Sequence, residues 1–236
     1  MFQRRFTMKH LLLLLSLTTI FASCGQVSSE DIDQDIIETD YYLNYNGENS
    51  TLEASGKFTI GGNTTYVTLD GESNLKVNNE VTKIDVNLFG QVSYVFKQSS
   101  AYQMNKNYQF VYTNKDQDKF VNSSTLPSSA SLSVPASIES DENLFVDWNV
   151  DQVNDQATSM YVGLSYNNGY TTHPVSAKNS NGQLELDSVQ LSEYRGQTIK
   201  LHLCRTRVKR NIENPGAGGR LEARYCSANK TVELKL

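Results

Sequence analysis

The segment LFVDWNV at residues 144–150 alternates apolar and polar side chains over its whole length. Successive side chains of a β-strand point to opposite faces, so a period of two predicts a strand with one buried and one solvated face. The same period recurs at residues 84–88, 92–96, 108–112, 160–166, 199–203 and 232–236. These segments predict an all-β protein.

Turn signals separate the alternating segments. They are Asn46-Gly47, Gly61-Gly62-Asn63, Asp70-Gly71, Asn168-Gly169 and Asn181-Gly182. Such pairs favour the tight turns that join antiparallel strands. Helical periodicity is confined to short stretches, and one or two helical turns are expected within residues 187–194. Short strands with frequent turns are typical of antiparallel β-sandwiches.

The composition limits the class of protein. The chain has 236 residues, a net charge of −5, 38% hydrophobic residues and four prolines. That length suffices for one large or two small domains with real cores. The composition argues against a disordered chain and against many membrane spans. The acidic balance argues against general nucleic-acid binding.

Residues 1–23 are typical of a secretory signal peptide. Arg4, Arg5 and Lys9 form a basic start, and an apolar run follows from Leu11 to Phe21. This run is too short to span a bilayer comfortably. Met8 begins a complete signal sequence by itself, so translation from Met1 or from Met8 stays open.

The signal ends in Phe21-Ala22-Ser23-Cys24, which resembles the lipobox of bacterial lipoproteins. The resemblance implies a lipid on the Cys24 thiol, cleavage before Cys24 and acylation of the new amine. Several acyl chains, at about 0.8 kcal/mol per buried CH₂, hold a protein on a membrane essentially permanently. Gly25, in place of an aspartate, favours the outer membrane of the cell envelope. The alternative is a secreted protein with an incidental cysteine.

Residues 24–40 contain six acidic residues and no basic residue. Such a segment is expected to be a flexible tether, because it offers little apolar surface to bury. A calcium loop beginning at Asp31 requires glycine and glutamate at its sixth and twelfth positions. Ile36 and Tyr42 occupy those positions, so no metal site is predicted there.

A Ser-rich stretch at residues 123–129 contains Pro127, the first proline of the chain. Such stretches often link domains. We therefore expect one β-sandwich over 41–126 and a second over 127–236, each of immunoglobulin-like size. A single large sandwich is the alternative.

The second unit resembles a fibronectin type III or related immunoglobulin-like domain. Leu132-Ser133-Val134-Pro135 is similar to its first strand, and residues 144–148 are similar to its second, with Trp148 as core tryptophan. Residues 196–201 resemble the turn into its sixth strand, although Ile199 replaces the usual tyrosine. Residues 108–112 and 124–127 are also similar to a module of uncharacterised envelope lipoproteins. That resemblance implies no particular activity.

Cys204 and Cys226 are expected to form a disulfide, since envelope compartments are oxidising. A hairpin joining their strands would centre on the glycine-rich turn at 214–219 and place the two cysteines opposite each other. Closing that loop stabilises by about 3 kcal/mol. His202 lies two residues from Cys204, but a shared metal site is not expected.

This hairpin is basic, with seven basic and two acidic residues between Lys200 and Tyr225. Strand parity predicts that Arg205, Arg207 and Lys209 share one face. One hypothesis is a patch that binds lipid phosphates or an acidic glycan. The alternative is a solvated face balanced by acidic residues elsewhere. The candidate anion-binding residues are Arg205, Arg207, Lys209, Arg210, Arg220 and Arg224.

Signals for catalysis are weak. Only His173 and His202 remain after signal cleavage, and the Gly-x-Ser-x-Gly motif of one hydrolase class does not occur. His173 precedes Pro174 and is expected in a surface loop. No cofactor and no metal are predicted. The sequence favours a non-catalytic binding or structural module whose partners are the membrane, through Cys24, and an envelope protein, glycan or lipid. An enzyme with a dispersed site stays as the alternative.

Overall fold

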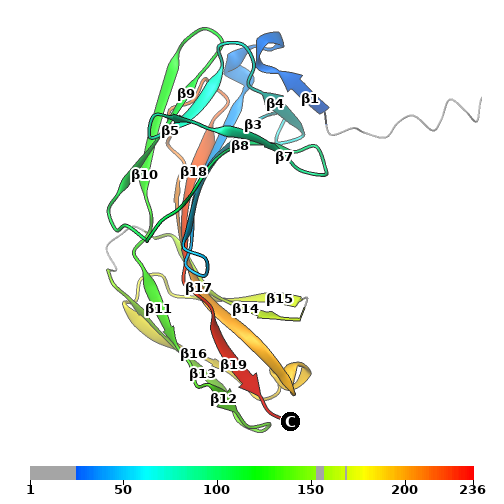
Figure 1. The fold of residues 1–236 in the computed structure, drawn as a ribbon, viewed down its shortest axis with the longest axis vertical. Coiled ribbons are helices and arrows are strands. Elements are labelled where there is room, and N and C mark those ends of the chain that lie inside the picture. Colours follow the sequence, from blue (N-terminus) through cyan, green and yellow to red (C-terminus); the bar gives the residue numbers. More distant parts are fainter. Residues whose placement is uncertain (1–24, 153–156, 168) are drawn as a thin grey trace, which may run out of the picture.

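The computed structural model describes residues 25–236 except 153–156 and 168. Cys24 and the signal segment therefore lie outside the described residues. The fold is all-β, as the alternation predicted, and the strands form a crescent that is open on one side (Figure 1). Within the described part, no helix is long and apolar enough to cross a membrane.

One large sheet runs the length of the crescent. Its central path is β1 (Gly25–Ser28), β4 (Thr65–Thr68), β3 (Thr51–Ile60), β2 (Glu38–Asn46), β18 (Gly219–Cys226), β17 (Gln197–Lys209), β14 (Ser159–Tyr166) and β15 (Gly169–Val175). Beside β3 it is extended by β8 (Val92–Ser99) and β7 (Lys83–Val86), and beside β17 by β19 (Lys230–Leu234) and β12 (Ser137–Ile138).

Two smaller sheets accompany the large one. The first contains β10 (Lys119–Thr125), β9 (Asn107–Thr113), β5 (Asn74–Val77) and β6 (Glu80–Val81). The second contains β11 (Ala130–Ser133), β13 (Leu144–Val150) and β16 (Asn181–Leu186). Three single 3₁₀ turns complete the fold, namely η1 (Ser29–Asp31), η2 (Gln34–Ile36) and η3 (Ser192–Tyr194). The last lies within the stretch where helical turns were predicted.

Strand β17 shows that both small sheets cover the same face of the large sheet. Leu201, Leu203 and Arg205 are fully or almost fully buried along one side of this strand. We call the part of the crescent around β13, β16 and β19 the lower unit and the part around β3, β5 and β9 the upper unit (Figure 1). The first half of β17 pairs with β19 in the lower unit, and its second half pairs with β18, which continues into the upper unit. In Figure 1 the small-sheet strands β10 and β11 follow the outer, convex side. Within the described part of the chain, no further sheet packs on the opposite, concave face.

Aromatic rings fill the upper core between the sheets. The ring of Tyr41 lies 5.2 Å from Phe110, and Phe58 lies 4.6 Å from Tyr112 between centroids. In the lower unit, the Trp148 ring lies so close to Gly182 that an added Cβ would be 2.2 Å away. Residues 181–182 pair with Asn149 and Trp148 of β13 and belong to strand β16, so the turn predicted there is wrong.

The acidic segment 24–40 is not a flexible tether over its described part, so that prediction is wrong. β1 pairs in parallel with β4, and Ser29 and Ile37 are fully buried. Gln34 is buried too; its Nε2 donates to the Ser29 carbonyl at 2.8 Å and its Oε1 accepts from Tyr112 Oη at 3.2 Å. Four buried residues, these three and Thr39, order the segment, and the average composition conceals them.

The chain is not divided cleanly at residue 126. β18, from the second predicted unit, pairs in parallel with β2 over eight residue pairs from Gly219↔Thr39 to Cys226↔Asn46. The upper sandwich therefore includes strands from the end of the chain. The Ser-rich stretch is packed, since Leu126 and Ser128 are 3% exposed. The long β17–β18 hairpin reaches back across the predicted boundary, which local composition cannot reveal.

Candidate binding face

A disulfide joins Cys204 to Cys226, as the hairpin predicted. The two residues are directly paired on β17 and β18, with 4.1 Å between their Cα atoms. The same register pairs Lys209 with Leu221, so the hairpin is centred on residue 215. The disulfide thus links β17, which takes part in both units, to β18, which pairs with β2.

Arg205 cannot contact an external anion, because its side chain is completely buried. Its Nη1 donates to the carbonyl oxygens of Ser128 at 3.0 Å and Gln152 at 3.5 Å. The predicted parity of Arg205 with the next two basic positions of β17 is correct. Their shared face, however, is the one that the small sheets cover, so the anion-binding prediction is wrong for Arg205.

Arg207 also forms hydrogen bonds within the chain. Its Nη2 donates to the hydroxyls of Ser124 at 3.1 Å and Thr125 at 2.8 Å, and to the Thr125 carbonyl. Arg205 and Arg207 therefore hold the stretch between the two small sheets. Lys209 and Arg210 are exposed at the end of the hairpin.

The remaining candidates lie on the uncovered face of the large sheet, together with acids. Arg220 Nε lies 3.7 Å from Asp40 Oδ2, and Arg224 Nη2 lies 2.6 Å from Glu222 Oε1. The predicted basic patch is therefore split between two faces. We call the uncovered surface the open face; it comprises Asp40, Tyr42, Asn44, Glu53, Lys57, Lys97, Tyr170, His202, Arg220, Glu222 and Arg224.

Tyr42 lies at the centre of a charged group on the open face. Lys57 Nζ is 5.5 Å and the Arg220 guanidinium 6.0 Å from the centre of its ring. The Tyr42 hydroxyl donates to Asp40 at 3.3 Å and accepts from Arg220 at 3.4 Å. Burial raises the pKa of the Tyr42 phenol, which keeps it protonated as a donor at neutral pH.

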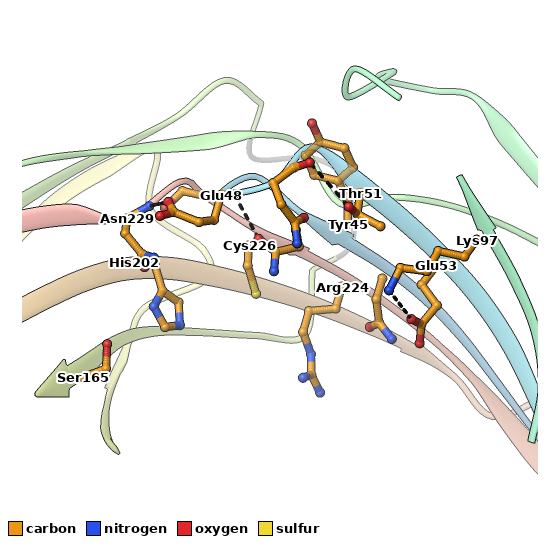
Figure 2. Close-up of a pocket in the computed structure, with 14 residues that line it drawn as sticks. Tyr45, Glu48, Thr51, Glu53, Lys97, Ser165, His202, Arg224, Cys226 and Asn229 are labelled. Atoms are coloured by element: carbon orange, nitrogen blue, oxygen red, sulfur yellow. Dashed lines mark hydrogen bonds and ion pairs between the residues drawn. The ribbon is translucent and has the colours of Figure 1, made fainter. Parts of the chain in front are cut away.

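The open face is hollowed where the two units meet. The hollow has a volume of about 460 Å³ and is lined by polar side chains, including Asn44, Glu48, Glu53, Lys97, His202 and Arg224. Figure 2 shows His202 and Arg224 projecting from the same side of the sheet, with the Lys97–Glu53 ion pair beside them. Two acids and two bases among these residues balance in charge.

His202 closes one end of the hollow. Its ring is stacked on Tyr170, with 5.8 Å between centroids and 10° between planes, and its Nε2 lies 3.4 Å from the Tyr170 hydroxyl. Burial lowers the pKa of His202. Nearby, Glu48 accepts a 2.8 Å hydrogen bond from the Asn229 backbone, and this bond lowers the pKa of Glu48.

The hydroxyl of Ser165, which lines the hollow, is hydrogen-bonded to the backbone. The Ser165 hydroxyl donates to the Lys200 carbonyl at 3.4 Å, which points it along the sheet. His173, predicted in a loop, lies half-buried within β15, beside Leu164 and Leu186, where burial lowers its pKa. Among the described residues, no group of three histidine, cysteine or acidic side chains could hold a metal ion.

Comparison with known proteins gives no family for this chain. No protein family matches it, and no curated protein matches it.

Most residues of the open face were not predicted as site residues from the sequence. The order Asp40-Tyr41-Tyr42-Leu43-Asn44 contains the signal, since polar and buried residues alternate there. The expected tether concealed the start of that pattern.

Proposed function

We propose that this chain is a lipid-anchored protein of the bacterial cell envelope, held in the outer membrane by Cys24. In this proposal it is a non-catalytic binding module, and the open face binds an uncharged glycan of the envelope. The anchor rests on the lipobox and the signal segment. The binding role rests on the open face.

The observation that carries the proposal is one uncovered, polar sheet face that continues through both units. Glycans offer hydroxyl groups for hydrogen bonds and flat C–H surfaces for aromatic rings. The open face supplies both kinds of partner, since Tyr170 is 54% exposed and contacts His202, which lines the hollow together with amide, carboxylate and guanidinium groups. Its hollow of about 460 Å³ falls within the usual range of small-ligand sites.

The charge pattern favours a neutral glycan over a polyanion. Lys97, Arg220 and Arg224 each lie within 4 Å of an acidic side chain. An anionic ligand would have to compete with those carboxylates. The polyanion alternative now depends on Lys209 and Arg210, which are exposed away from the hollow.

The test is binding of the full chain to oligosaccharides released from the envelope polysaccharide of the producing cells. Tyr170→Ala and Glu53→Ala should each weaken binding about tenfold, which corresponds to about 1.4 kcal/mol. Phe145→Ala is the matched control, because Phe145 is 43% exposed on the convex side.

The dependence of binding on salt concentration distinguishes a neutral-glycan site from a polyanion site. Binding to an uncharged glycan should change little with ionic strength, since screening acts on charges. Binding that disappears in high salt and in Lys209→Glu/Arg210→Glu would instead support a polyanion site. Equal affinity of the wild type and both open-face variants would contradict the proposal.

A further inference from the structure

The turn between β7 and β8 exposes apolar side chains that most proteins bury. Leu88 is fully exposed, Phe89 is 79% exposed, and Val86 and Ile84, just before them, are 50% and 57% exposed. Residues 86–91 contain no charged side chain. A contiguous exposed apolar group of this kind commonly marks a contact with a partner or a membrane.

Hydrogen bonds hold the turn in a defined shape. Asn87 Oδ1 accepts from the backbone N–H of Phe89 at 2.9 Å and of Gln91 at 3.0 Å. The Gly90 N–H donates to the Asn87 carbonyl at 3.0 Å, and Gly90 adopts a φ of +74°. The turn therefore presents Leu88 and Phe89 outward as part of its structure.

The same turn lies beside the start of the described chain. Gln26 Nε2 donates to the Gly90 carbonyl at 3.0 Å, and Gln26 is two residues from Cys24. Figure 1 shows β1 and the β7–β8 hairpin at the same end of the crescent. A lipid on Cys24 would consequently bring the exposed turn close to the bilayer surface.

We propose that Leu88 and Phe89 insert into the bilayer that holds Cys24. This inference rests on the lipid anchor in the proposed function. A lipid surface fits better than a protein groove, because the chain preceding Gly25 leads to the membrane and because the turn is uncharged. Anchoring confines the turn near the lipid, which gives it a high effective concentration there. Two attachment points would also fix the orientation of the open face.

A tryptophan reporter tests the insertion. The chain has one tryptophan, Trp148, which is 7% exposed in the lower unit. The acylated mature protein, which begins at Cys24, is incorporated into phosphatidylcholine vesicles whose acyl chains do or do not carry bromine, a short-range quencher. Phe89→Trp and Leu88→Trp are compared with Val189→Trp, since Val189 is also 79% exposed but lies in the lower unit.

We expect brominated lipid to lower the added fluorescence of Phe89→Trp and Leu88→Trp by about twofold, because interfacial apolar side chains reach about 5–10 Å into the bilayer boundary. Val189→Trp and the wild type should be unaffected. Equal quenching of Phe89→Trp and Val189→Trp would overturn the inference. Intact mass tests the anchor separately: a protein without acyl chains contradicts both proposals, whereas an acylated but unquenched protein contradicts only the insertion.

Discussion

Arg205 shows how one side chain can join two units. It lies where the two small sheets meet and donates to the carbonyls of Ser128 and Gln152. A buried arginine is costly to desolvate, so hydrogen bonds to its guanidinium are needed to offset that cost. The Ser128 carbonyl belongs to the stretch that sequence composition marked as a linker, whereas Gln152 follows strand β13.

Replacing Arg205 by methionine should destabilise the protein by about 2–4 kcal/mol, because the buried Ser128 carbonyl loses a charged donor. Urea unfolding measures the loss. Arg210→Met is the control and should change the free energy of unfolding by less than about 0.5 kcal/mol, since Arg210 is exposed. Equal effects of the two substitutions would show that Arg205 has no structural role.

Acid should destabilise the fold through its histidines. Burial lowers the pKa of His202 and of His173 in the folded state, whereas the unfolded value is about 6.5. The unfolded chain thus binds more protons just below that pH, and stability is lost as the pH falls through this window. Glu48, whose pKa is also lowered, loses its contribution only below its own ordinary range.

His202→Asn should therefore flatten the decline in unfolding free energy between about pH 7 and pH 5.5. Urea titrations at the two pH values measure the decline. His173→Asn should act in the same direction. A wild type that is equally stable at both pH values would contradict this assignment.

The hairpin of β17 and β18 is the element that organises the fold. β17 takes part in both units, and β18 adds the chain's last part to the upper sheet beside β2. Reducing the Cys204–Cys226 disulfide, which closes a loop with a sequence separation of 22, should lower stability by about 3 kcal/mol. The Cys204→Ala/Cys226→Ala variant should reproduce the loss, and an unchanged unfolding midpoint on reduction would refute it.

The N-terminal segment depends on Gln34. Gln34→Ala removes hydrogen bonds to Ser29, Ile32 and Tyr112, so residues 25–37 should lose hydrogen-exchange protection while the core strands keep theirs. A cost of about 1–3 kcal/mol is expected for the buried partners left unsatisfied. If these amides already exchange freely in the wild type, the segment is a tether after all.

At the scale of the molecule, alternation predicted the strands but could not predict which faces would be covered. The parity of Arg205 and Arg207 followed from the sequence, yet their burial depends on where two distant sheets pack. Asp40 and Arg220 meet on the open face although 180 positions separate them. A site assembled from strands so far apart in the chain leaves no local motif, whereas the paired cysteines left a clear one.

The crescent presents one uncovered face on a continuous sheet, and the chain start and the exposed turn at Leu88 lie together at one end (Figure 1). A protein held at that end would keep the open face available to partners in the envelope. The proposed binding role would therefore depend on the whole molecule and on no single loop.

The most direct test is photo-crosslinking in intact cells, with a photoreactive residue replacing Tyr170 on the open face or Phe145 on the convex side. Both side chains are exposed, at 54% and 43%. We predict specific adducts from position 170 that disappear in Cys24→Ala, and only background from position 145. Equal yields from the two positions, or adducts from position 145 alone, would contradict the assignment of the open face as the binding surface.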